Sequence, residues 1–319
     1  MSNKKSDYIR HNAVSIEFQK DESWSILSPV EQSIKAKIDT IGTPLNKWNI
    51  RINYGIKTGL NEAFIIDKAT RDMLIAQDPK SAEIIRPILR GKDIKRYTYE
   101  FADMYLIASH NGYQDIDGNK IEPIDIDEYP SISAWMNSEA WNTRPDKGTA
   151  YERLNSRTDK GTTPYNLRDC AYLDDFNRQK IMYAETMRVH KGEGADRFPR
   201  FSIDDSSYYT DKTCFVMTGD QLKYILAIIN SSLAKYIIKS NVAVLDKGGF
   251  LMQKIYVEQF PIPKTNHETI TELEMLVDNA IDARTAKEST NDFEDKIDRI
   301  VYDMFGFTDE EVAVIESSL

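Results

Sequence analysis

The sequence predicts an α+β fold, in which a mixed sheet is followed by a helical region at the C-terminus. Short segments with the alternating or apolar pattern of strands occur at 48–54, 104–108, 180–184 and 214–217. A long apolar stripe at helical spacing runs from 221 to 239, and two amphipathic helical patterns follow residue 265. We therefore expect an N-terminal extension over 1–19, a mixed domain over 20–265 and a helical region over 266–319.

The N-terminal half begins with a clear helix signal. Ser28, Pro29 and Glu31 supply an N-cap, a proline suited to the first helical position and a capping-box glutamate, and Gly42 ends the helix. An alternating strand then leads into NYGIKTGLNEAFIID, where a glycine loop precedes a second predicted strand, AFIID. A short helix is expected at 68–77, and a hairpin or surface loop at 111–130.

Helical patterns dominate the C-terminal part. Residues 221–239 predict one long helix, with its apolar face formed by Leu222, Ile225, Ile228, Ile229, Leu233 and Ile237. The stretch FPIPK (260–264) predicts a boundary. Helices follow at 268–287 and 291–305, the second with Asn291 and Glu294 at capping-box spacing, and Thr308 with Glu311 predicts a third. We expect these helices to dock through their apolar stripes and to expose their acidic faces.

Composition argues against several classes of protein. The chain has 319 residues, of which 41% are hydrophobic, but no uninterrupted apolar window of about 18 residues, so we expect no membrane span. The N-terminus lacks the apolar stretch of a signal peptide. Cys170 and Cys214 are too few for a disulfide framework, which favours the cytoplasm. The histidines are scattered and none stands at ligand spacing from a cysteine, which argues against a zinc site.

The net charge of −10 is unevenly distributed. Residues 266–319 contain 15 acidic and 4 basic residues, a net charge of −11, which leaves 37 basic and 36 acidic residues in the rest. Overall acidity would argue against a nucleic-acid partner, but a nearly neutral body can carry a basic face.

The glycine loop resembles a phosphate-binding loop only in its residue types. Gly55-Ile-Lys-Thr-Gly59 matches neither G-x-G-x-x-G nor G-x-x-x-x-G-K-[ST], and a strand rather than a helix is predicted to follow it. Two interpretations remain open for this loop. It is either a structural hairpin or a contact to a nucleic-acid phosphate through Lys57, Thr58 and Asn61.

Two clusters mix basic residues with tyrosines. The first, RPILRGKDIKRYTY (86–99), contains Arg90, Lys92, Lys95 and Arg96, and the second contains Arg153, Arg157, Lys160, Thr162, Thr163, Tyr165, Asn166 and Arg168. One such cluster alone is most simply a solvated face paired with nearby acids. Two clusters, the glycine loop and the turn at Lys247 together favour a surface that faces DNA, because lysine and arginine neutralise phosphates.

We assign these residues two kinds of contact. Phosphate contacts are expected from Lys57, Lys92, Lys95, Arg96 and Lys160. Base-edge contacts are expected from Arg153, Asn166, Arg168 and Lys247, because arginine and asparagine can pair bidentately with bases.

Two other functional classes stay open. Asp78-Pro-Lys80, Asp93-Ile-Lys95 and Glu294-Asp-Lys296 fit the short D/E-x-K fragment of nucleases, so a stand-alone metal-dependent nuclease is one alternative. A protein-interaction module, with its acidic helices bound to a partner subunit, is the other. No G-x-S-x-G elbow of a serine hydrolase occurs.

Several longer stretches carry a family resemblance. They are INYGIKTGLNEAFIID, DPKSAEIIRPILRGKDIKRY, DKGTTPYNLRDCAY, LKYILAIINSSLAKYI, YVEQFPIPK and DRIVYDMFGFTDEE. The chain resembles the TaqI-like C-terminal specificity domain of the adenine-specific methyltransferases in bacterial type IIG restriction–modification enzymes. The resemblance implies a target-recognition domain that grips double-stranded DNA and reads bases through loops, followed by helices that pack on the rest of the enzyme.

The resemblance also implies a catalytic partner. In the family a methyltransferase domain precedes this region, with a glycine-rich S-adenosylmethionine loop and an Asn/Asp-Pro-Pro-Tyr/Phe motif. No Pro-Pro pair and no such loop occur here. We therefore expect no catalytic residue, no metal and no cofactor in this chain. S-adenosylmethionine is expected in a methyltransferase domain or subunit outside it, as part of a site-specific adenine-N6 methyltransferase with or without an endonuclease.

Overall fold

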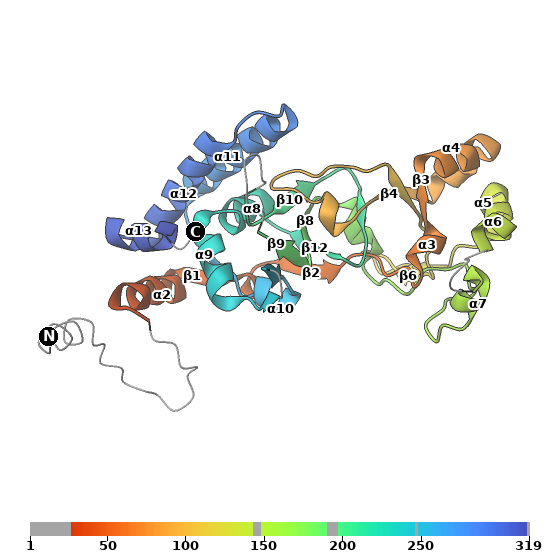
Figure 1. Ribbon diagram of the computed structural model, residues 1–319, viewed down its shortest axis with the longest axis horizontal. Coiled ribbons are helices and arrows are strands. Elements are labelled where there is room, and N and C mark those ends of the chain that lie inside the picture. The colour runs from red at the N-terminus through yellow and green to blue at the C-terminus, as the bar shows by residue number, and fades with distance from the viewer. Residues whose placement is uncertain (1–26, 143–147, 190–196, 246–247, 318–319) are drawn as a thin grey trace, which may run out of the picture.

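The computed structural model describes residues 27–142, 148–189, 197–245 and 248–317. The molecule is elongated (Figure 1). The first helix and the last three lie at one end, a four-stranded sheet occupies the middle, and a second sheet with short helices forms the other end. This arrangement confirms the predicted α+β fold.

The central sheet is antiparallel and is buried on both faces. Its strands, in order across the sheet, are β10 (Phe201–Asp204), β8 (Lys180–Ala184), β12 (Cys214–Gly219) and β2 (Ile50–Tyr54). Alternate residues of a strand point to opposite faces. Phe215 and Met217 of β12 therefore join one hydrophobic core, and Cys214 and Val216 join the other. Covering both faces explains why these strands read as continuous apolar runs.

Helices cover the first core. They are α2 (Pro29–Ile41), α8 (Leu222–Ile229), α9 (Ser232–Asn241), α11 (His267–Thr285), α12 (Asn291–Phe305) and α13 (Asp309–Ser317). The predicted capping box of Ser28 and Glu31 is present, as is that of Thr308 and Glu311. For α12 the predicted N-cap is displaced by one residue, because Thr290 is the N-cap and its hydroxyl donates to Glu294 Oε1 (2.8 Å).

The long helix expected at 221–239 is two helices, so that prediction was wrong. The break falls at Asn230, whose side chain bonds to both the amide and the carbonyl of Phe201 in β10 (3.0 Å each). Ser231 then caps α9 by accepting from the amide of Ala234 (3.2 Å). An asparagine bound to a strand edge and a serine N-cap outweigh the continuous apolar pattern.

The second core lies under a mixed sheet. Its strands, in order, are β11 (Tyr209–Thr210), β4 (Ile85–Leu89), β5 (Met104–Ile107) and β3 (Ile65–Asp67), with β11 parallel to β4 and the other pairs antiparallel. The helices around it are α3 (Asn61–Phe64), α4 (Lys68–Gln77), α5 (Pro130–Met136), α6 (Glu139–Asn142) and α7 (Ala150–Asn155). The strand predicted at 63–67 is thus shorter than expected, because its first two residues complete the turn of α3.

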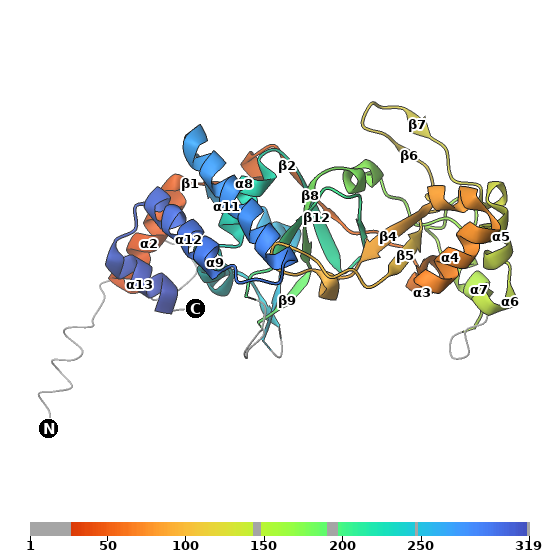
Figure 2. The same ribbon diagram turned by 90° about the horizontal axis from the view of Figure 1, so that it is seen from above.

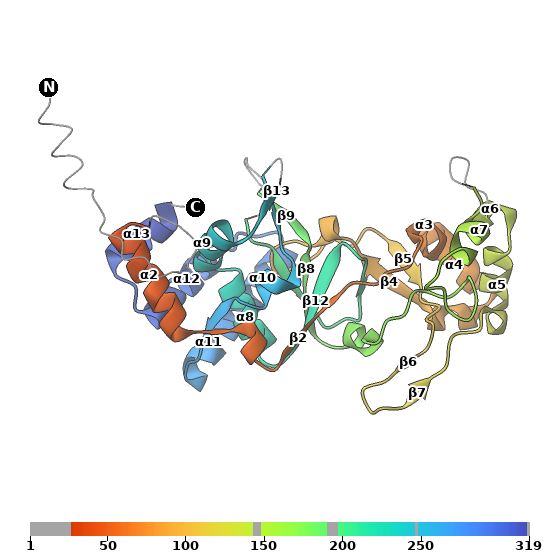
Figure 3. The same ribbon diagram turned by 90° about the horizontal axis from the view of Figure 1, so that it is seen from below.

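Three smaller sheets complete the fold. They are β1 (Gly42–Pro44) with β15 (Pro261–Pro263), the hairpin of β6 (Tyr113–Gln114) and β7 (Lys120–Ile121), and a ribbon of β9 (Thr186–Arg188), β14 (Gly249–Leu251) and β13 (Val244–Leu245). Figures 2 and 3 show the β6–β7 hairpin and the ribbon projecting from opposite sides. The remaining elements are η1 (Leu45–Lys47), η2 (Pro79–Glu83), η3 (Gly91–Asp93), η4 (Ile126–Glu128), η5 (Leu173–Asn177) and α10 (Lys254–Val257).

The C-terminal helices are part of the first core. Leu273, Val277 and Ile297 are buried there together with residues of the central sheet. The apolar stripes therefore dock on the body, as the sequence predicts, while the division at residue 265 stays a prediction. Within the described residues, no helix is long and apolar enough to cross a bilayer.

Candidate nucleic-acid interface

The glycine loop (residues 55–59) lies against the turn of residues 210–214. The amide of Gly55 donates to the carbonyl of Cys214 (2.8 Å). A Cβ atom at position 55 would lie 1.9 Å from the carbonyl oxygen of Asp211, so any side chain would force the two segments apart. Glycine is required here for a close backbone contact, not for a nucleotide.

Arg157 joins the glycine loop to the second basic cluster. Its guanidinium donates to the carbonyl oxygens of Thr58 (3.0 Å), Leu154 (3.2 Å) and Asn166 (2.9 Å). Gly59 has φ +83°, and a Cβ there would lie 2.1 Å from a guanidinium nitrogen. Burial lowers the pKa of Arg157, but arginine remains charged in proteins. Two segments that are distant in the sequence are therefore fixed side by side.

Lys57 occupies the exposed side of this loop. Its Nζ lies 4.3 Å from the ring centroid of Tyr54, and that ring packs on Phe215 at a centroid distance of 4.5 Å. Thr58 is buried, and its hydroxyl donates to Oδ1 of the half-buried Asn61 (2.6 Å). Lys57 is thus placed to meet a ligand. Thr58 stabilises the loop instead, which corrects its predicted role, while the contact expected at Asn61 stays a prediction.

Three exposed lysines lie along the contact between these segments, and we call them the lysine ridge: Lys57, Lys212 and Lys92. Ile56 and Asp211 form a parallel bridge and are both buried. The next residue of each segment, Lys57 and Lys212, is exposed, and Lys212 stands in the turn that follows Asp211.

Lys92 enters the ridge through its neighbour. The amide of Gly91 donates to Oγ1 of Thr213 (2.9 Å). Lys92 follows Gly91 and Lys212 precedes Thr213, so this hydrogen bond brings the two lysines close together. None of the three ridge lysines forms an ion pair with an acid in the described part of the chain. Unpaired charges of one sign that lie close together raise the local positive potential.

Arg90 and Lys95 of the first basic cluster are paired with acids. Arg90 holds Asp93 through two nitrogens (2.9 and 3.0 Å), and this pairing raises the pKa of Arg90. Lys95 lies 3.3 Å from Glu100 and donates to the carbonyl of Lys92 (3.0 Å). Among the predicted phosphate contacts of this cluster, Lys92 alone is both exposed and unpaired within the described residues.

Arg96 is a structural residue, which corrects its predicted contact with phosphate. It is 4% exposed and forms a two-nitrogen ion pair with Glu294 of α12 (3.0 and 3.1 Å). Arg197 also reaches Glu294 (2.6 Å). Burial alone would lower the pKa of Arg96, but its neighbours Tyr97 and Glu294 raise it overall. The guanidinium could reach solvent only by breaking both of its hydrogen bonds to this buried carboxylate.

Asn166 is likewise structural, and its predicted base contact is corrected. Its side chain is fully buried. Oδ1 accepts from the amide and hydroxyl of Thr163 (2.9 and 2.8 Å), and Nδ2 donates to the carbonyls of Ile124 (2.9 Å) and His110 (3.3 Å). These bonds use both ends of the amide, so none remains for a base.

The rest of the second cluster is closer to solvent. Lys160 is exposed and donates to the backbone carbonyl of Asn155 (2.7 Å), and the half-buried Arg153 has no side-chain partner among the described residues. Arg168 lies 2.6 Å from Asp159, although the two are not aligned as a hydrogen bond. The predicted contact at Lys247 lies outside the described residues.

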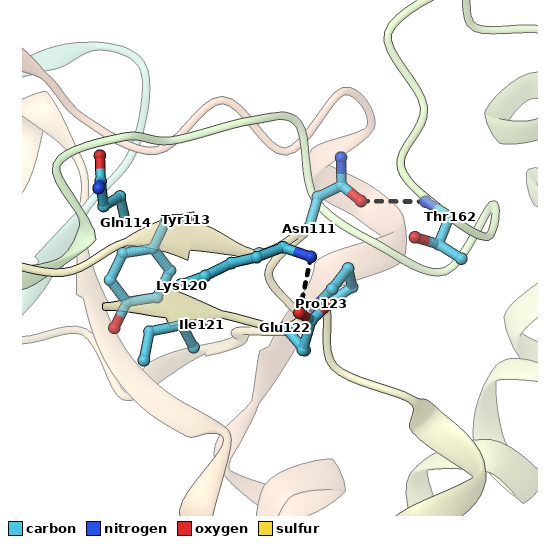
Figure 4. A pocket seen from close by; sticks show the side chains of 9 residues that line it. Asn111, Tyr113, Gln114, Lys120, Ile121, Glu122, Pro123 and Thr162 are labelled. Atoms are coloured by element: carbon cyan, nitrogen blue, oxygen red, sulfur yellow. Dashed lines mark hydrogen bonds and ion pairs between the residues drawn. The ribbon is translucent and has the colours of Figure 1, made fainter. Parts of the chain in front are cut away.

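Tyr165 and Thr162 form hydrogen bonds with Asn137 and Asn111. The Tyr165 hydroxyl donates to Asn137 (2.6 Å), and burial raises the pKa of this tyrosine. Thr162 is exposed, and its amide donates to Asn111 Oδ1 (3.0 Å). It lines an open depression of about 590 Å³ beside the β6–β7 hairpin, where Lys120 is paired with Glu122 (2.7 Å; Figure 4).

Metal-binding groups do not gather in the described residues. No group of three or more His, Cys, Asp or Glu side chains there could hold an ion. Two carboxylates of the predicted D/E-x-K fragments, Asp93 and Glu294, are held in the arginine pairs described above. The nuclease alternative therefore gains no geometric support from these residues.

Lys212 is the ridge residue that the sequence did not identify. It stands in Asp211-Lys-Thr213, where Asp211 Oδ1 accepts from the amide of Thr213 (3.0 Å) to form the turn. In the sequence, Asp-Lys-Gly at 146–148, 159–161 and 246–248 shares this pattern of an aspartate followed directly by a lysine. The threonine in place of glycine hid the fourth copy.

Two solved restriction–modification enzymes are similar to this chain, and the first of them shares its fold. One is the type IIL restriction–modification enzyme MmeI in complex with DNA, at a TM-score of 0.58 and 15% identity over 86% of this chain and 36% of that chain. Another is the type IIG restriction endonuclease BpuSI, at a TM-score of 0.45 and 12% identity over 86% of this chain and 33% of that chain. The chain thus spans about a third of the length of each.

No functionally curated protein matches the chain. A family model does: the TaqI-like C-terminal specificity domain matches residues 86–262, which is more than half of the sequence. The matched region includes two of the three ridge lysines and the central strands β8, β10 and β12. The chain belongs to the family of TaqI-like C-terminal specificity domains.

Proposed function

We propose that this chain binds double-stranded DNA as the target-recognition region of a type IIG-like restriction–modification enzyme. The observation that carries the proposal is the lysine ridge on a specificity-domain fold. Lys57, Lys92 and Lys212 are exposed, adjacent through backbone contacts and free of acidic partners in the described residues. Lysines in this state release counterions from the DNA when they approach its phosphates, which favours binding.

The proposal includes a catalytic partner outside this chain. A methyltransferase domain or subunit that binds S-adenosylmethionine would modify adenine at N6, after the target base has left the duplex stack. The role of this chain would be to hold the site in register for that step. The lack of a Pro-Pro pair and of a glycine-rich cofactor loop in the sequence supports this division of tasks. Calorimetry with S-adenosylmethionine tests it, and micromolar binding to this chain alone would contradict it.

Salt-dependent binding tests the DNA proposal. Binding of a fluorescent duplex is measured across salt concentrations for the wild type, for Lys57→Ala/Lys92→Ala/Lys212→Ala, and for a matched control. The control is Lys264→Ala/Lys296→Ala/Arg299→Ala, which removes three exposed positive charges at and beyond the start of the C-terminal helices. If each ridge lysine neutralises one phosphate, the slope of log K against log[salt] should lose about 3 units of magnitude in the ridge variant.

The two triple variants separate a local contact from general charge. Both lower the net charge equally, so a non-specific attraction would weaken binding to the same degree in both. A loss confined to the ridge variant supports the proposed interface. A wild-type protein without salt-dependent duplex binding would contradict the proposed function, and equal losses in both variants would contradict the ridge as its site.

A further inference from the structure

The ribbon of β9, β14 and β13 has one buried and one exposed face. Val244, Phe250 and Met187 stand opposite one another across the three strands, and the last two are buried in the first core. Residues opposite one another on neighbouring strands point to the same face. The next row, Leu245, Gly249 and Arg188, therefore points outward.

The outward row consists of an apolar residue, a glycine and a cation. Leu245 is 36% exposed. Arg188 is exposed, and its guanidinium has no hydrogen-bond or ion-pair partner in the described residues. Between them lies Gly249, which is buried, so the surface of this face is formed by the side chains around it, including the exposed Thr186 and Arg188.

The base of the ribbon is tied to the lysine ridge. The amide of Glu185 donates to the carbonyl of Thr213 (2.8 Å), next to Lys212, and the amide of Met252 donates to the carbonyl of Glu185 (2.7 Å). In Figure 3, β9 and β13 project on the same side as α3, the element that follows the glycine loop. A duplex held by the ridge would therefore meet the ribbon on this side.

We propose that the ribbon enters the major groove of the bound duplex and reads base edges with Arg188 and Leu245. The inference rests on the proposed DNA-binding function. A narrow β-ribbon fits the major groove, where an arginine can pair with guanine O6 and N7 and an apolar side chain can contact the thymine methyl group.

The strand spacing adds a distance to the proposal. Arg188 and Leu245 stand two strands apart, which is about 10 Å because neighbouring strands lie about 4.8 Å apart. Successive base pairs rise by about 3.4 Å along one strand. The guanine read by Arg188 and the thymine read by Leu245 should therefore lie about three base pairs apart.

Selection from a randomised duplex library tests this. The wild type, Arg188→Gln, Leu245→Ala and the control Arg299→Gln are each allowed to bind the library, and the bound fraction is sequenced. Arg188→Gln should lose the preference for guanine at one position by about tenfold. Leu245→Ala should weaken the preference for thymine about three base pairs away, and the control should keep both.

Each outcome has a separate meaning. Because Arg188 and Leu245 are exposed, both variants should keep the wild-type melting temperature. Their affinity for a duplex of random sequence should fall by no more than the loss of one positive charge near a phosphate would cause. A wild type with no salt-dependent duplex binding overturns the proposed function and this inference with it. A wild type that binds without sequence preference, or whose preference survives in both variants, overturns the ribbon proposal while leaving the lysine ridge intact.

Discussion

Surroundings decide what each basic residue of this chain does. Arg96 and Lys92 belong to one cluster, yet Arg96 is buried against Glu294 while Lys92 is exposed beside the turn of Thr213. Arg157 represents a third case: within the described residues it forms no ion pair, and its guanidinium donates to backbone carbonyls. It is a positioning residue: it holds the loop that carries Lys57.

We expect Arg157 and Lys57 to act on DNA binding as one unit. Arg157→Ala should release the glycine loop and weaken duplex binding as much as Lys57→Ala does, each shrinking the salt slope by about one unit. The double variant should bind the duplex no more weakly than either single variant, because the loss of Arg157 already displaces Lys57 from the interface. Titrations of the three variants measure this coupling. Independent, additive losses would show that Arg157 does not act through Lys57.

The buried pair of Arg96 and Glu294 predicts an asymmetric stability effect. Arg96→Met should lower the free energy of unfolding by about 3–5 kcal/mol, because it leaves a buried carboxylate without its main partner. Arg96→Met/Glu294→Met should recover most of that loss. Urea denaturation of both variants is the measurement. A double variant as unstable as the single one would mean that the loss of stability comes from poorer side-chain packing and not from the unpaired carboxylate.

At the scale of elements, hydrogen-bonding side chains decide where helices begin and how they dock. Thr308 caps α13, and Glu311 in its first turn accepts from Ser33 and Lys37 of α2 (2.6 Å each). Burial alone would raise the pKa of Glu311, but the hydrogen bonds from Lys37, Ser33 and the Thr308 amide outweigh it and lower the pKa to about 2. One carboxylate thus joins the first and last helices.

This shift gives stability a defined pH dependence. A carboxyl whose pKa is depressed in the folded state contributes stability above its unfolded pKa of about 4.3, and the contribution is lost as pH falls toward 2. Glu311→Gln should therefore cost about 1–3 kcal/mol at pH 7 and progressively less below pH 4. Denaturation at several pH values tests this against Glu310→Gln, an exposed neighbour. Equal effects of the two variants at pH 7 would contradict it.

Elements that depend on nearby residues could be predicted from the sequence, and those that depend on distant partners could not. The capped helices at 29–41 and 68–77 match their local signals. The break at Asn230 depends on a strand edge at Phe201, which no local pattern reveals. The same limit applies to the candidate site. The residue types of Lys57 and Lys92 are enough to predict a phosphate contact, but the burial of Arg96 depends on Glu294, which is far along the chain.

At the scale of the whole molecule, the C-terminal helices are inseparable from the sheet. Ending the chain after Lys264 would remove Leu273, Ile297 and Phe305 from the first core and leave Arg96 buried without Glu294. We expect this truncation to abolish the cooperative thermal transition, whereas removing α13 alone should only lower its midpoint. Calorimetry compares the two. A truncated chain that still melts cooperatively would show that residues 27–264 fold by themselves.

The central sheet also limits how such proteins can be recombined. Because β8 and β12 send alternate residues into two cores, each end of the molecule uses this sheet as its wall. In a chimera that joined one end of this chain to the other end of a relative, the side chains on both faces of the central sheet would have to pack correctly at the same time. New DNA preferences should therefore be easier to graft as loops or as the outer row of the ribbon, whose residues leave both cores untouched, than as half-molecules.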